Sequence, residues 1–444
     1  MSRICIVRHY YYPEDPRGRR EAEALAAAGH DVEVLALRKA GEAPHDEVNG
    51  VRVRRLPVEH RRGSVARYCF EYGAFFVLAC LTLTWRHLRR RYAVVQVNTM
   101  PDLLVFVAAL PKLLGARIVL DMHESMPELF LTKYQVAASH PMVRLLGLAE
   151  QASIRFADQA IVCTPQQRDT YVARGARAEK ITIVLNSANT ALFRPRDTGP
   201  APWRPGAPFR LITHGLIEQR YGHDTMVRAV ALLREEIPGL TLQIYGRGQY
   251  LPDLTALIHE LGVADRVQLK GFVPHEELLA GITRAHVGLV ATRRDPFWEL
   301  AHTQKMFEYV AMRRPVIIGE TRAVRDYFDD ACFGFFVADD PADLARRILT
   351  LYHHPERAQW MVASASRRYR EYCWEHQQHC YCHAVLGDAV AAPDSVSVAG
   401  EHRGTDVLLG RGMSSGPTLT DSVAPLFATE RPVMQTMSEE TGTK

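Results

Sequence analysis

Short apolar runs alternate with amphipathic stretches along most of the chain. Arg3–Arg8, Val32–Leu37 and Ala93–Val97 are rich in Val, Ile and Leu, a pattern that predicts buried strands. Arg17–Ala28 has helical periodicity, and Gly29 is suited to end that helix as a C-cap. Strands and helices that alternate at this spacing predict doubly wound α/β sheets.

The alternation is interrupted once, by a Pro-rich segment over residues 193–208 that is typical of a linker. We therefore predict an N-terminal Rossmann-like domain over residues 1–192 and a second one over residues 209–366. A chain of 444 residues is long enough for two such domains.

Two further segments follow the second domain. A last helix is predicted from about Glu356 to Leu386. From Asp388 onward Gly, Ser, Pro and Thr dominate and periodicity is weak, so we predict a disordered tail over residues 388–444.

The most specific chemistry lies in the stretch Asp295–Pro315. A buried strand, Ala285–Thr292, precedes the stretch, and another, Val316–Gly319, follows it. A helix starting near Thr303 therefore has its N-terminus at the carboxyl edge of a parallel sheet, where ligands bind. The free N–H groups and positive dipole end of a helix N-terminus suit a phosphate.

Lys305 and Glu308 lie on this predicted helix. Lys305 is in the first turn, where it adds positive charge, and Glu308 is one turn further, on the same face as Gln304. A carboxylate at that position is placed to bridge two vicinal hydroxyls, as on a ribose. A surface helix whose charges are merely solvated is an equal alternative on the pattern alone.

Composition and the first turn exclude several classes of protein. The first turn reads RHYYYPEDPRG, without the glycine fingerprint of dinucleotide-binding enzymes, which argues against nicotinamide or flavin chemistry. A net charge of +4 is too weak and dispersed for nucleic acid to be the main partner. The eight cysteines form no framework, and MSRICIV enters a strand without a signal peptide, so a reducing cytosol is expected.

The longest apolar run is Tyr72–Trp85, which by itself is shorter than the roughly 20 residues needed to span a bilayer. Arginines flank the run, among them Arg67 before it and Arg89 after it. A helix lying on a membrane surface with arginines for anionic head groups is one interpretation. A buried helix of the first domain is the other.

The pattern of motifs resembles the family-4 retaining glycosyltransferases, a bacterial sugar-nucleotide-dependent group. The resemblance covers about residues 3–386. The motifs that carry it are HTQKMFEYVAMRRPVI (His302–Ile317), THGLIEQRYG (Thr213–Gly222), LQIYGRGQYLPDL (Leu242–Leu254), LKGFVPHEEL (Leu269–Leu278) and VLNSANTALFRP (Val184–Pro195).

The family implies the GT-B fold, in which two Rossmann-like domains face a cleft and residues 367–387 form a helix crossing back to the first domain. It also implies transfer of a sugar from a nucleotide diphosphate sugar, with UDP expected, to a glycan or lipid-linked acceptor of cell-envelope polysaccharide or glycoconjugate synthesis. The cleft motifs contain no Asp-x-Asp, so no metal is required and the nucleotide sugar is a co-substrate. A cytoplasmic enzyme, peripheral on the inner membrane face, fits this expectation.

The resemblance also assigns donor residues. Glu308 matches the second motif glutamate, which holds the ribose hydroxyls, whereas Leu300 stands in place of the first and Glu299 is one position away. Thr303 and Gln304 are expected to offer backbone N–H groups to the diphosphate.

The family's usual Arg and Lys after the first strand of the second domain are replaced by Leu216 and Tyr221. Arg220 is the nearest cation, and we expect it to share the diphosphate with Lys305. The other expected donor contacts come from small residues and from backbone groups facing the base, with a core position as the alternative for Phe272. These residues are Gly215, Gly246, Gly248, Phe272 and Val273.

On the acceptor side, His123 and Glu124 follow a strand end of the first domain. His123 is expected to touch the donor sugar or the acceptor, with a structural histidine as the equal alternative. Arg17, Arg19 and Arg20, beside the first loop, are expected to meet an acceptor phosphate, and a solvated basic helix is the alternative.

Three other interpretations remain open. In the first, the chain is a non-catalytic subunit that binds a sugar nucleotide, which the displaced glutamate and cations favour. In the second, it is a GT-B sugar-nucleotide epimerase. A metal site near the C-terminus is disfavoured, because the spacing fits no standard zinc pattern. The residues concerned are Cys373, His376, His379, Cys380, Cys382 and His383.

Overall fold

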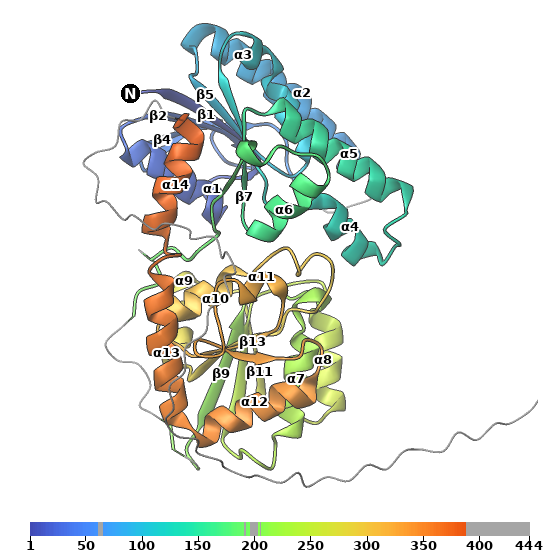
Figure 1. Cartoon of the computed structure of the whole chain (residues 1–444), viewed down its shortest axis with the longest axis vertical. Helices are drawn as coiled ribbons and strands as arrows, with labels where there is room; N and C mark the ends of the chain where they lie inside the picture. The colour runs from blue at the N-terminus through green and yellow to red at the C-terminus, as the bar shows by residue number, and fades with distance from the viewer. Residues whose placement is uncertain (61–64, 191, 196–202, 205, 388–444) are drawn as a thin grey trace, which may run out of the picture. The chain divides into compact units, whose positions relative to one another are not determined.

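The computed structural model describes residues 1–60, 65–190, 192–195, 203–204 and 206–387 (Figure 1). The predicted tail over residues 388–444 and much of the predicted linker over residues 193–208 lie outside the described residues.

The N-terminal domain is built on an eight-stranded sheet with the order β3-β4-β2-β1-β5-β6-β7-β8. Every pair is parallel except β3–β4, which is antiparallel. The strands are β1 (Arg3–Tyr11), β2 (Asp31–Leu37), β3 (His45–Val48), β4 (Val51–Leu56), β5 (Val94–Asn98), β6 (Arg117–Asp121), β7 (Gln159–Val162) and β8 (Ile181–Ile183).

Helices cover both faces of this sheet because its strands alternate apolar side chains to either side. In β1, Ile4 and Ile6 pack with α1 (Pro16–Ala27) and α14 (Trp374–Leu386), whereas Cys5 and Val7 face the opposite layer. The helices of that opposite layer are α2 (Val65–Arg90), η1 (Asp102–Ala108), α5 (Pro141–Phe156) and α6 (Pro165–Ala173). The remaining helices of the domain are α3 (Ala109–Leu113), α4 (Met126–Tyr134) and η2 (Ala178–Lys180).

Helix α2 is longer than the apolar run that marks it in the sequence. Among the described residues it is the one helix whose length and composition would allow it to cross a membrane, with a mean hydropathy of 1.3. The expectation that the segment is too short to span is therefore wrong on length. Only 22% of its apolar window is buried, so the alternative of a fully buried helix is also wrong.

The second domain has a six-stranded, all-parallel sheet with the order β11-β10-β9-β12-β13-β14. Its strands are β9 (Phe209–His214), β10 (Leu240–Tyr245), β11 (Val267–Gly271), β12 (Val287–Val290), β13 (Val316–Gly319) and β14 (Gly334–Phe336).

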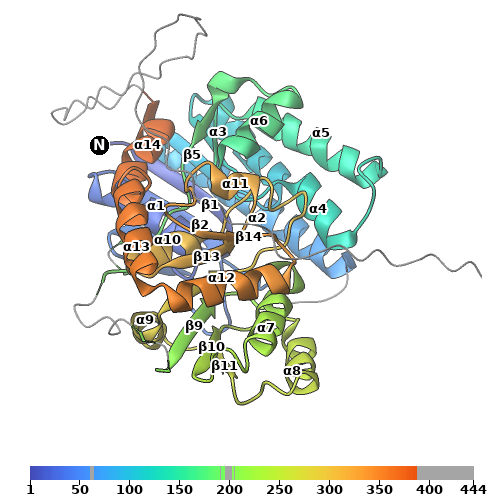
Figure 2. The ribbon, with the colours of Figure 1, turned by 60° about the horizontal axis from the view of Figure 1, so that its bottom comes forward.

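Helices also cover both faces of this sheet, as Figure 2 shows from a second direction. One layer contains α7 (His223–Leu232), α8 (Leu251–Glu260) and α12 (Pro341–His353). The other contains α9 (His275–Arg284), α10 (Gln304–Ala311) and α11 (Arg322–Arg325). A short turn, η3 (Gln219–Tyr221), follows β9.

The C-terminal segment is two helices, so the prediction of one helix to Leu386 is wrong. The first, α13 (Pro355–Tyr369), packs against α10, and α14 contacts α1, β5, β7 and β8 of the first domain. Cys373, the N-cap residue of α14, has an extended backbone, and this break lets the chain pass from one domain to the other. The crossing-back itself is confirmed.

The strand orders fix where a ligand site can form. In the first sheet β1 lies between β2 and β5, and in the second β9 lies between β10 and β12, so the strand order reverses at β1 and at β9. In open α/β sheets the crevice for ligands opens at the carboxyl ends of such strands. The loops after β1, β5, β6, β9 and β12 are therefore the segments that can form a ligand site.

A buried acidic cluster lies beneath α5 in the first domain. Glu128 and Glu150 pair with Arg174, which is 2.9 Å from a Glu150 oxygen, and the buried Asp102 lies within reach of the Glu150 charge. Burial is the main cause that raises the pKa values of Asp102 and Glu150 to about 7. The folded state therefore tolerates these carboxyls when they are protonated, and it loses stability when they are charged.

We expect Asp102→Asn to stabilise the protein at pH 8 and to have little effect at pH 4. Because the folded-state pKa of Asp102 is raised, its protonation stabilises the wild-type fold at low pH, and this stability is lost as the pH rises toward 7. The asparagine amide of the variant does not ionise, so the variant does not lose this stability as the pH rises. The measurement is urea unfolding at both pH values, with the exposed Asp253→Asn as control. Equal effects of the two substitutions across the pH range would contradict the prediction.

Candidate functional site

A pocket of about 370 Å³ opens at the carboxyl edges of both sheets. The residues that line it from the first domain are Arg17, His123, Glu124, Cys163, Gln167 and Asn186. Those from the second are His214, Gly215, Leu216, Tyr221, Phe297, Trp298, Ala301, His302, Thr303, Gln304, Lys305 and Glu308. Eight of the predicted site residues thus line one pocket. Five come from the donor side, Gly215, Thr303, Gln304, Lys305 and Glu308, and three come from the first domain, Arg17, His123 and Glu124.

The N-terminus of α10 points into this pocket. The helix begins after Thr303, as predicted, and Thr303 has the extended backbone of an N-cap residue. Its hydroxyl makes no capping hydrogen bond and is buried without a partner among the described residues. Free N–H groups and an unpartnered hydroxyl at a pocket wall are what an anionic ligand would satisfy.

Lys305 is the cation at this helix terminus. Its side chain is buried, and Nζ lies 4.3 Å from the centre of the Tyr221 ring. Burial lowers the pKa of Lys305 to about 8, Glu308 opposes that shift and Arg220 adds to it. A buried ammonium beside an aromatic ring, with the negative charge of Glu308 acting on it, is available to a bound anion.

Glu308 lies one turn further along α10, beside the first strand of the domain. One of its carboxylate oxygens, Oε2, is 3.2 Å from Nε2 of His214, at the end of β9. His214 also lines a second hollow of about 280 Å³, together with Gly215 and Leu216. The two hollows therefore meet beside Glu308, and together they form an elongated site.

The second hollow has mainly apolar walls, to which Tyr245, Val273 and Leu278 contribute. Phe272 stands at its edge with 74% of its surface exposed, so the alternative of a core position is wrong. The Arg247 guanidinium lies 4.7 Å from the centre of the Phe272 ring. An aromatic ring and apolar walls suit the flat face of a nucleobase.

Gly246 and Gly248 were predicted to let the backbone approach the ligand closely, and the structure shows that packing between two loops also requires them. A Cβ on Gly246 would lie 1.8 Å from the carbonyl oxygen of Gly215, and one on Gly248 would lie 1.9 Å from that of Ile217. Gly246 also has a φ of +137°. Close packing of the two loops therefore requires glycine at these positions whether or not a ligand approaches.

Arg220 lies behind the pocket wall. Its guanidinium is 5.2–5.9 Å from the ring centres of Tyr221, Phe297 and Trp298, and Nε is 3.1 Å from a Glu218 oxygen. Its Nη1 is buried without a hydrogen-bond partner among the described residues. The structure therefore places Arg220 near Lys305, and the predicted contact with the diphosphate stays a prediction.

Glu299 does not replace the displaced motif glutamate in the pocket. Its Oε1 accepts a hydrogen bond from Arg294 Nε at 2.9 Å, and its Oε2 accepts one from the backbone N–H of Arg322 at 3.0 Å. Phe297 and Trp298 of the same loop line the pocket. The wall at this point is aromatic where the family resemblance implied a carboxylate.

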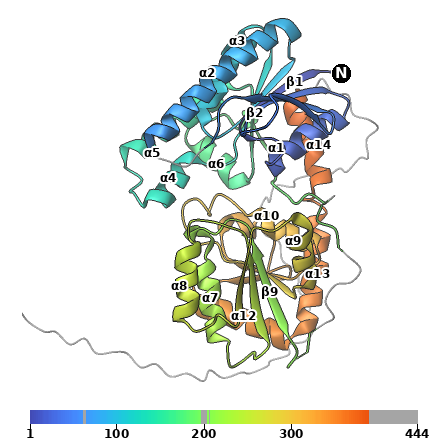
Figure 3. The same cartoon turned by 180° about the vertical axis from the view of Figure 1, so that it is seen from behind.

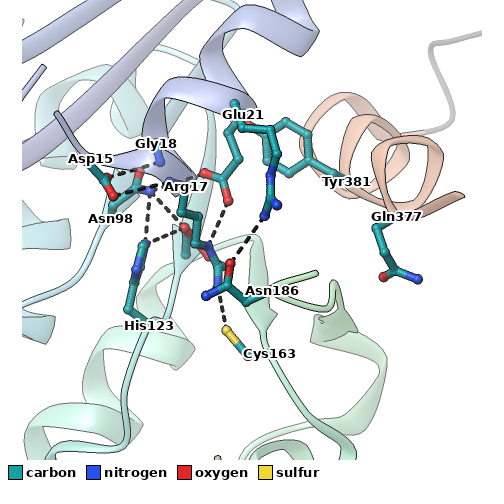
Figure 4. Close-up of polar contacts among 12 residues, drawn as sticks. Asp15, Arg17, Gly18, Glu21, Asn98, His123, Cys163, Asn186, Gln377 and Tyr381 are labelled. Atoms are coloured by element: carbon teal, nitrogen blue, oxygen red, sulfur yellow. Dashed lines mark hydrogen bonds and ion pairs between the residues drawn. The ribbon is translucent and has the colours of Figure 1, made fainter. Parts of the chain in front are cut away.

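Arg17 belongs to a buried polar network of the first domain (Figure 4). Its Nε donates to Glu21 at 2.9 Å, and its two terminal nitrogens donate to Asp121 and Cys163. Arg17 lines the pocket, but these internal acceptors already take its donors. The alternative of a solvated basic helix is wrong for Arg17, because it is buried.

Arg20 is also held internally. Its guanidinium stacks 4.0 Å from the centre of the Trp374 ring on α14 and donates to Asn186 Oδ1 at 3.3 Å. Its other terminal nitrogen donates to the Ser187 carbonyl oxygen. Arg20 therefore links α1 to the C-terminal helix and to the loop after β8, and the structure gives it a structural role.

His123 sits at the end of β6, in the pocket wall. Its Nε2 is 2.8 Å from both an Arg8 guanidinium nitrogen and Oδ2 of Asp121. Burial, followed by the charges of Arg8 and Arg17, lowers the pKa of His123 well below its usual value. The imidazole is thus neutral at physiological pH and is a polar contact for a hydroxyl rather than a cation.

Sequence reasoning missed most of this network. Asn98 and Asp121 end β5 and β6, and Arg8 lies within β1 beside them. The three residues are register partners across these neighbouring strands. Asn98 donates to Asp121 at 2.7 Å, and its amide is 3.3 Å from His123 Nε2. A polar residue closing each of three apolar strand runs was the signal that could have found them.

The C-terminal cysteines and histidines make no metal site in the described part of the chain. No group of three or more His, Cys, Asp or Glu side chains there has the arrangement that would hold a metal ion.

Two family models match the chain, one on each domain. Residues 16–187 match the glycosyl transferase 4-like domain, and residues 208–354 match the glycosyl transferases group 1. The two matches follow each other in the order of the two sheets.

Several named proteins are similar in sequence. D-inositol 3-phosphate glycosyltransferase 1 of Catenulispora acidiphila is 29% identical over 269 residues, which cover 56% of this chain and 63% of that protein. Glycogen synthase of Mycobacterium tuberculosis is 26% identical over 363 residues, which cover 78% of this chain and 83% of that protein. The match thus spans less than two thirds of the length of the inositol phosphate enzyme.

Solved structures share the fold. Sucrose-phosphate synthase from Thermosynechococcus elongatus superimposes with a TM-score of 0.70 at 21% identity, covering 85% of this chain and 97% of that one. The Anabaena protein HepE, solved in complex with UDP-glucose, gives a TM-score of 0.65 at 13% identity, with 86% and 99% covered. At these identities the likeness confirms the GT-B architecture.

Proposed function

The chain belongs to the glycosyltransferases that these two family models describe, and from this premise we propose that it moves a sugar from a nucleoside diphosphate sugar to an acceptor alcohol. The observation that carries the proposal is the buried Lys305 at the uncapped N-terminus of α10, with Glu308 one turn further on, where the two hollows meet. The cation and the helix terminus suit a diphosphate, and the carboxylate suits the hydroxyls of a ribose.

We propose that the base occupies the hollow beside Phe272 and the diphosphate lies over Gly215 and Lys305. The ribose hydroxyls then reach Glu308. The sugar extends toward His123 and Glu124 of the first domain, where the acceptor also enters. A UDP sugar is the proposed donor. HepE was solved with UDP-glucose, and this supports the choice of base by analogy alone.

In the proposed reaction the bond between the anomeric carbon and the diphosphate oxygen breaks, and the acceptor oxygen forms the new bond on the same face of the sugar. Negative charge builds on the leaving diphosphate, which takes the acceptor's proton. Lys305 and the N–H groups of α10 stabilise that charge most as the bond breaks, which is why they accelerate the reaction. The neutral His123 holds a hydroxyl in place without competing for the proton.

The proposed acceptor is a glycan or lipid-linked saccharide of cell-envelope synthesis, modified on the cytoplasmic side of the membrane. Arg17 and Arg20 no longer support a phosphate on the acceptor, because internal partners hold both. Glu124 remains the acceptor-side candidate in the pocket wall, and burial raises its pKa.

A second candidate function is a non-catalytic subunit that binds the nucleotide sugar. The observation that favours it is Glu299, which turns to Arg294 and Arg322 and leaves an aromatic wall where the family has a carboxylate. Donor hydrolysis stimulated by an acceptor separates the two functions, since a binding subunit releases no nucleotide.

We expect the protein to bind one of UDP, GDP, ADP and dTDP, and Glu308→Ala to weaken that binding about tenfold or more. Charged hydrogen bonds to two ribose hydroxyls are worth a few kcal/mol, so their loss should be easily measured. The measurement is calorimetry on the wild type and the variant, with Glu236→Ala on the exposed surface of the same domain as the control.

Two results would contradict the donor site. One is a folded protein that binds none of the four nucleotides. The other is nucleotide affinity that Glu308→Ala and Glu236→Ala leave equally unchanged.

A further inference from the structure

The outer face of α2 is apolar from one end to the other. Phe70, Val77, Leu81, Trp85 and Leu88 recur at helical spacing and are all exposed, with 76% of Phe70 and 63% of Leu81 accessible. No charged residue interrupts this stripe between Arg67 and Arg89. Surface helices of soluble domains normally turn a polar face outward, so the stripe calls for a partner.

The inner face of α2 shows that the helix lies on the domain. Phe75, Ala79 and Leu83 pack into the core beneath the first sheet. Arg86 pairs with Glu33 of β2 at 2.7 Å, and His60 Nδ1 is 2.6 Å from buried Glu71. A membrane span would pull these groups off the sheet and place them in hydrocarbon, so the partner must approach from the side.

Neighbouring helices broaden the apolar face. η1 contacts both α2 and α5, and α3 contacts α2, so these helices form one layer over the sheet (Figure 3). Leu113 of α3 is 83% exposed and Leu148 of α5 is 69% exposed, and Leu145 beside it is exposed as well.

The charges on α2, η1, α3 and α5 are sorted by sign. The described residues of α2, η1, α3 and α5 include three acidic side chains, Glu71, Asp102 and Glu150, and all three are buried. The exposed charged side chains of these helices are all arginines: Arg67, Arg89, Arg144 and Arg155. A chain with 54 basic and 50 acidic residues has no overall excess that would produce this, so the sorting is local.

We propose that the face formed by α2, α3 and α5 docks on a bilayer of anionic phospholipids, with α2 lying in the plane of the interface. The exposed leucines and Phe70 enter the boundary between head groups and acyl chains, and the arginines meet the phosphates. Arg89 lies 4.1 Å from the centre of the Trp85 ring. This arrangement suits a membrane–water interface, where the ring is buried among lipids and the guanidinium stays hydrated.

The docked face ends close to the reaction edge of the first sheet. At Phe70 the stripe meets a hollow of about 340 Å³, lined by Ala74 and Leu78 of α2 and by Val58 and Glu59, which follow β4. β4 runs parallel to β2, and β2 to β1, so the hollow opens on the edge that carries the pocket. If the proposed function holds, a lipid-linked acceptor reaches the site from the membrane at this end.

The test is co-sedimentation of the full chain with phosphatidylcholine vesicles, with and without phosphatidylglycerol. We expect binding only to the anionic vesicles, reduced by salt, and we expect Leu81→Glu to weaken it about tenfold or more. Leu232→Glu is the matched control, because Leu232 is a 57% exposed leucine on α7 of the other domain. The control should bind as the wild type does.

Three outcomes would overturn the proposal: no binding to anionic vesicles, equal loss in both variants, or a protein that dimerises through α2 so that Leu81→Glu yields the monomer. Sedimentation velocity identifies the last. Nucleotide binding by calorimetry is measured on the same samples, so a failure of the donor site is recognised separately from a failure of membrane docking.

Discussion

Replacement of Lys305 by alanine is expected to lower kcat/KM at least about a hundredfold while the protein stays folded. Removing one preorganised donor to a developing negative charge typically costs this much. Lys305 is the buried cation at the N-terminus of α10, and the usual Arg and Lys positions of the domain hold Leu216 and Tyr221. In the proposed function, Lys305 therefore has the main share of a role that the family resemblance assigns to several cations.

The measurement is acceptor-dependent release of nucleoside diphosphate, with the exposed Lys270→Ala as control. Stability should not fall in the Lys305 variant, since burial of an ammonium opposes folding and alanine removes that cost. If Lys305→Ala keeps wild-type kcat/KM, the charge on the leaving group is stabilised elsewhere, and Arg220 becomes the first residue to test.

The pH profile gives a second readout for the same residue. The pKa of Lys305 is about 8, so the free enzyme loses the cation as the pH rises through that value. We therefore expect kcat/KM to decline above pH 8, and Lys305→Arg, if it retains activity, to lack that decline, because arginine stays charged. A decline that is the same in both proteins would assign the titration to another group.

Local pattern was enough to predict the parts of the fold that are written in contiguous residues. The unit of β12, α10 and β13 followed from two apolar runs, an N-cap residue and a closing proline, and α10 does begin after Thr303. The two doubly wound domains followed from the alternation and its one interruption. These features depend on neighbours in sequence, so a single sequence contains them.

The first domain's site was predicted less well because it depends on which strands become neighbours. Arg8, Asn98 and Asp121 are far apart in the chain and meet only because β1 pairs with β5 and β5 with β6. The break between α13 and α14 has the same origin. The helical pattern continues across residues 370–373, and the contacts of α14 with the other domain end the first helix there.

The arginines beside the first loop have different surroundings for a simple physical reason. Arg17, Arg19 and Arg20 lie on one turn of α1, where composition gives no means of telling a solvated face from a buried one. The Arg19 side chain is 43% exposed and pairs with Glu23 at 2.8 Å, whereas Arg17 is enclosed with Glu21, Asp121 and Cys163. Arg17 and Arg19 lie on the same helix, so replacing each in turn compares how much a buried and a partly exposed arginine contribute to stability.

We expect Arg17→Met to destabilise the protein by about 3–5 kcal/mol, the usual cost of removing one partner from a buried ion pair. The substitution leaves the carboxylates of Glu21 and Asp121 buried without the guanidinium that both contact. Arg19→Met on the same helix should cost at most about 1 kcal/mol, because an exposed pair contributes little.

Urea unfolding of the two variants measures the difference in their free energies of unfolding. Steady-state kinetics at varied acceptor concentration tests the alternative that Arg17 binds the acceptor. A network role predicts a lower free energy of unfolding for Arg17→Met and, in whatever protein remains folded, an acceptor KM close to that of Arg19→Met. If instead both variants are equally stable and only Arg17→Met raises the acceptor KM, then Arg17 releases its internal partners to bind the acceptor. Its position in the pocket wall would then be the reason that an arginine stands there.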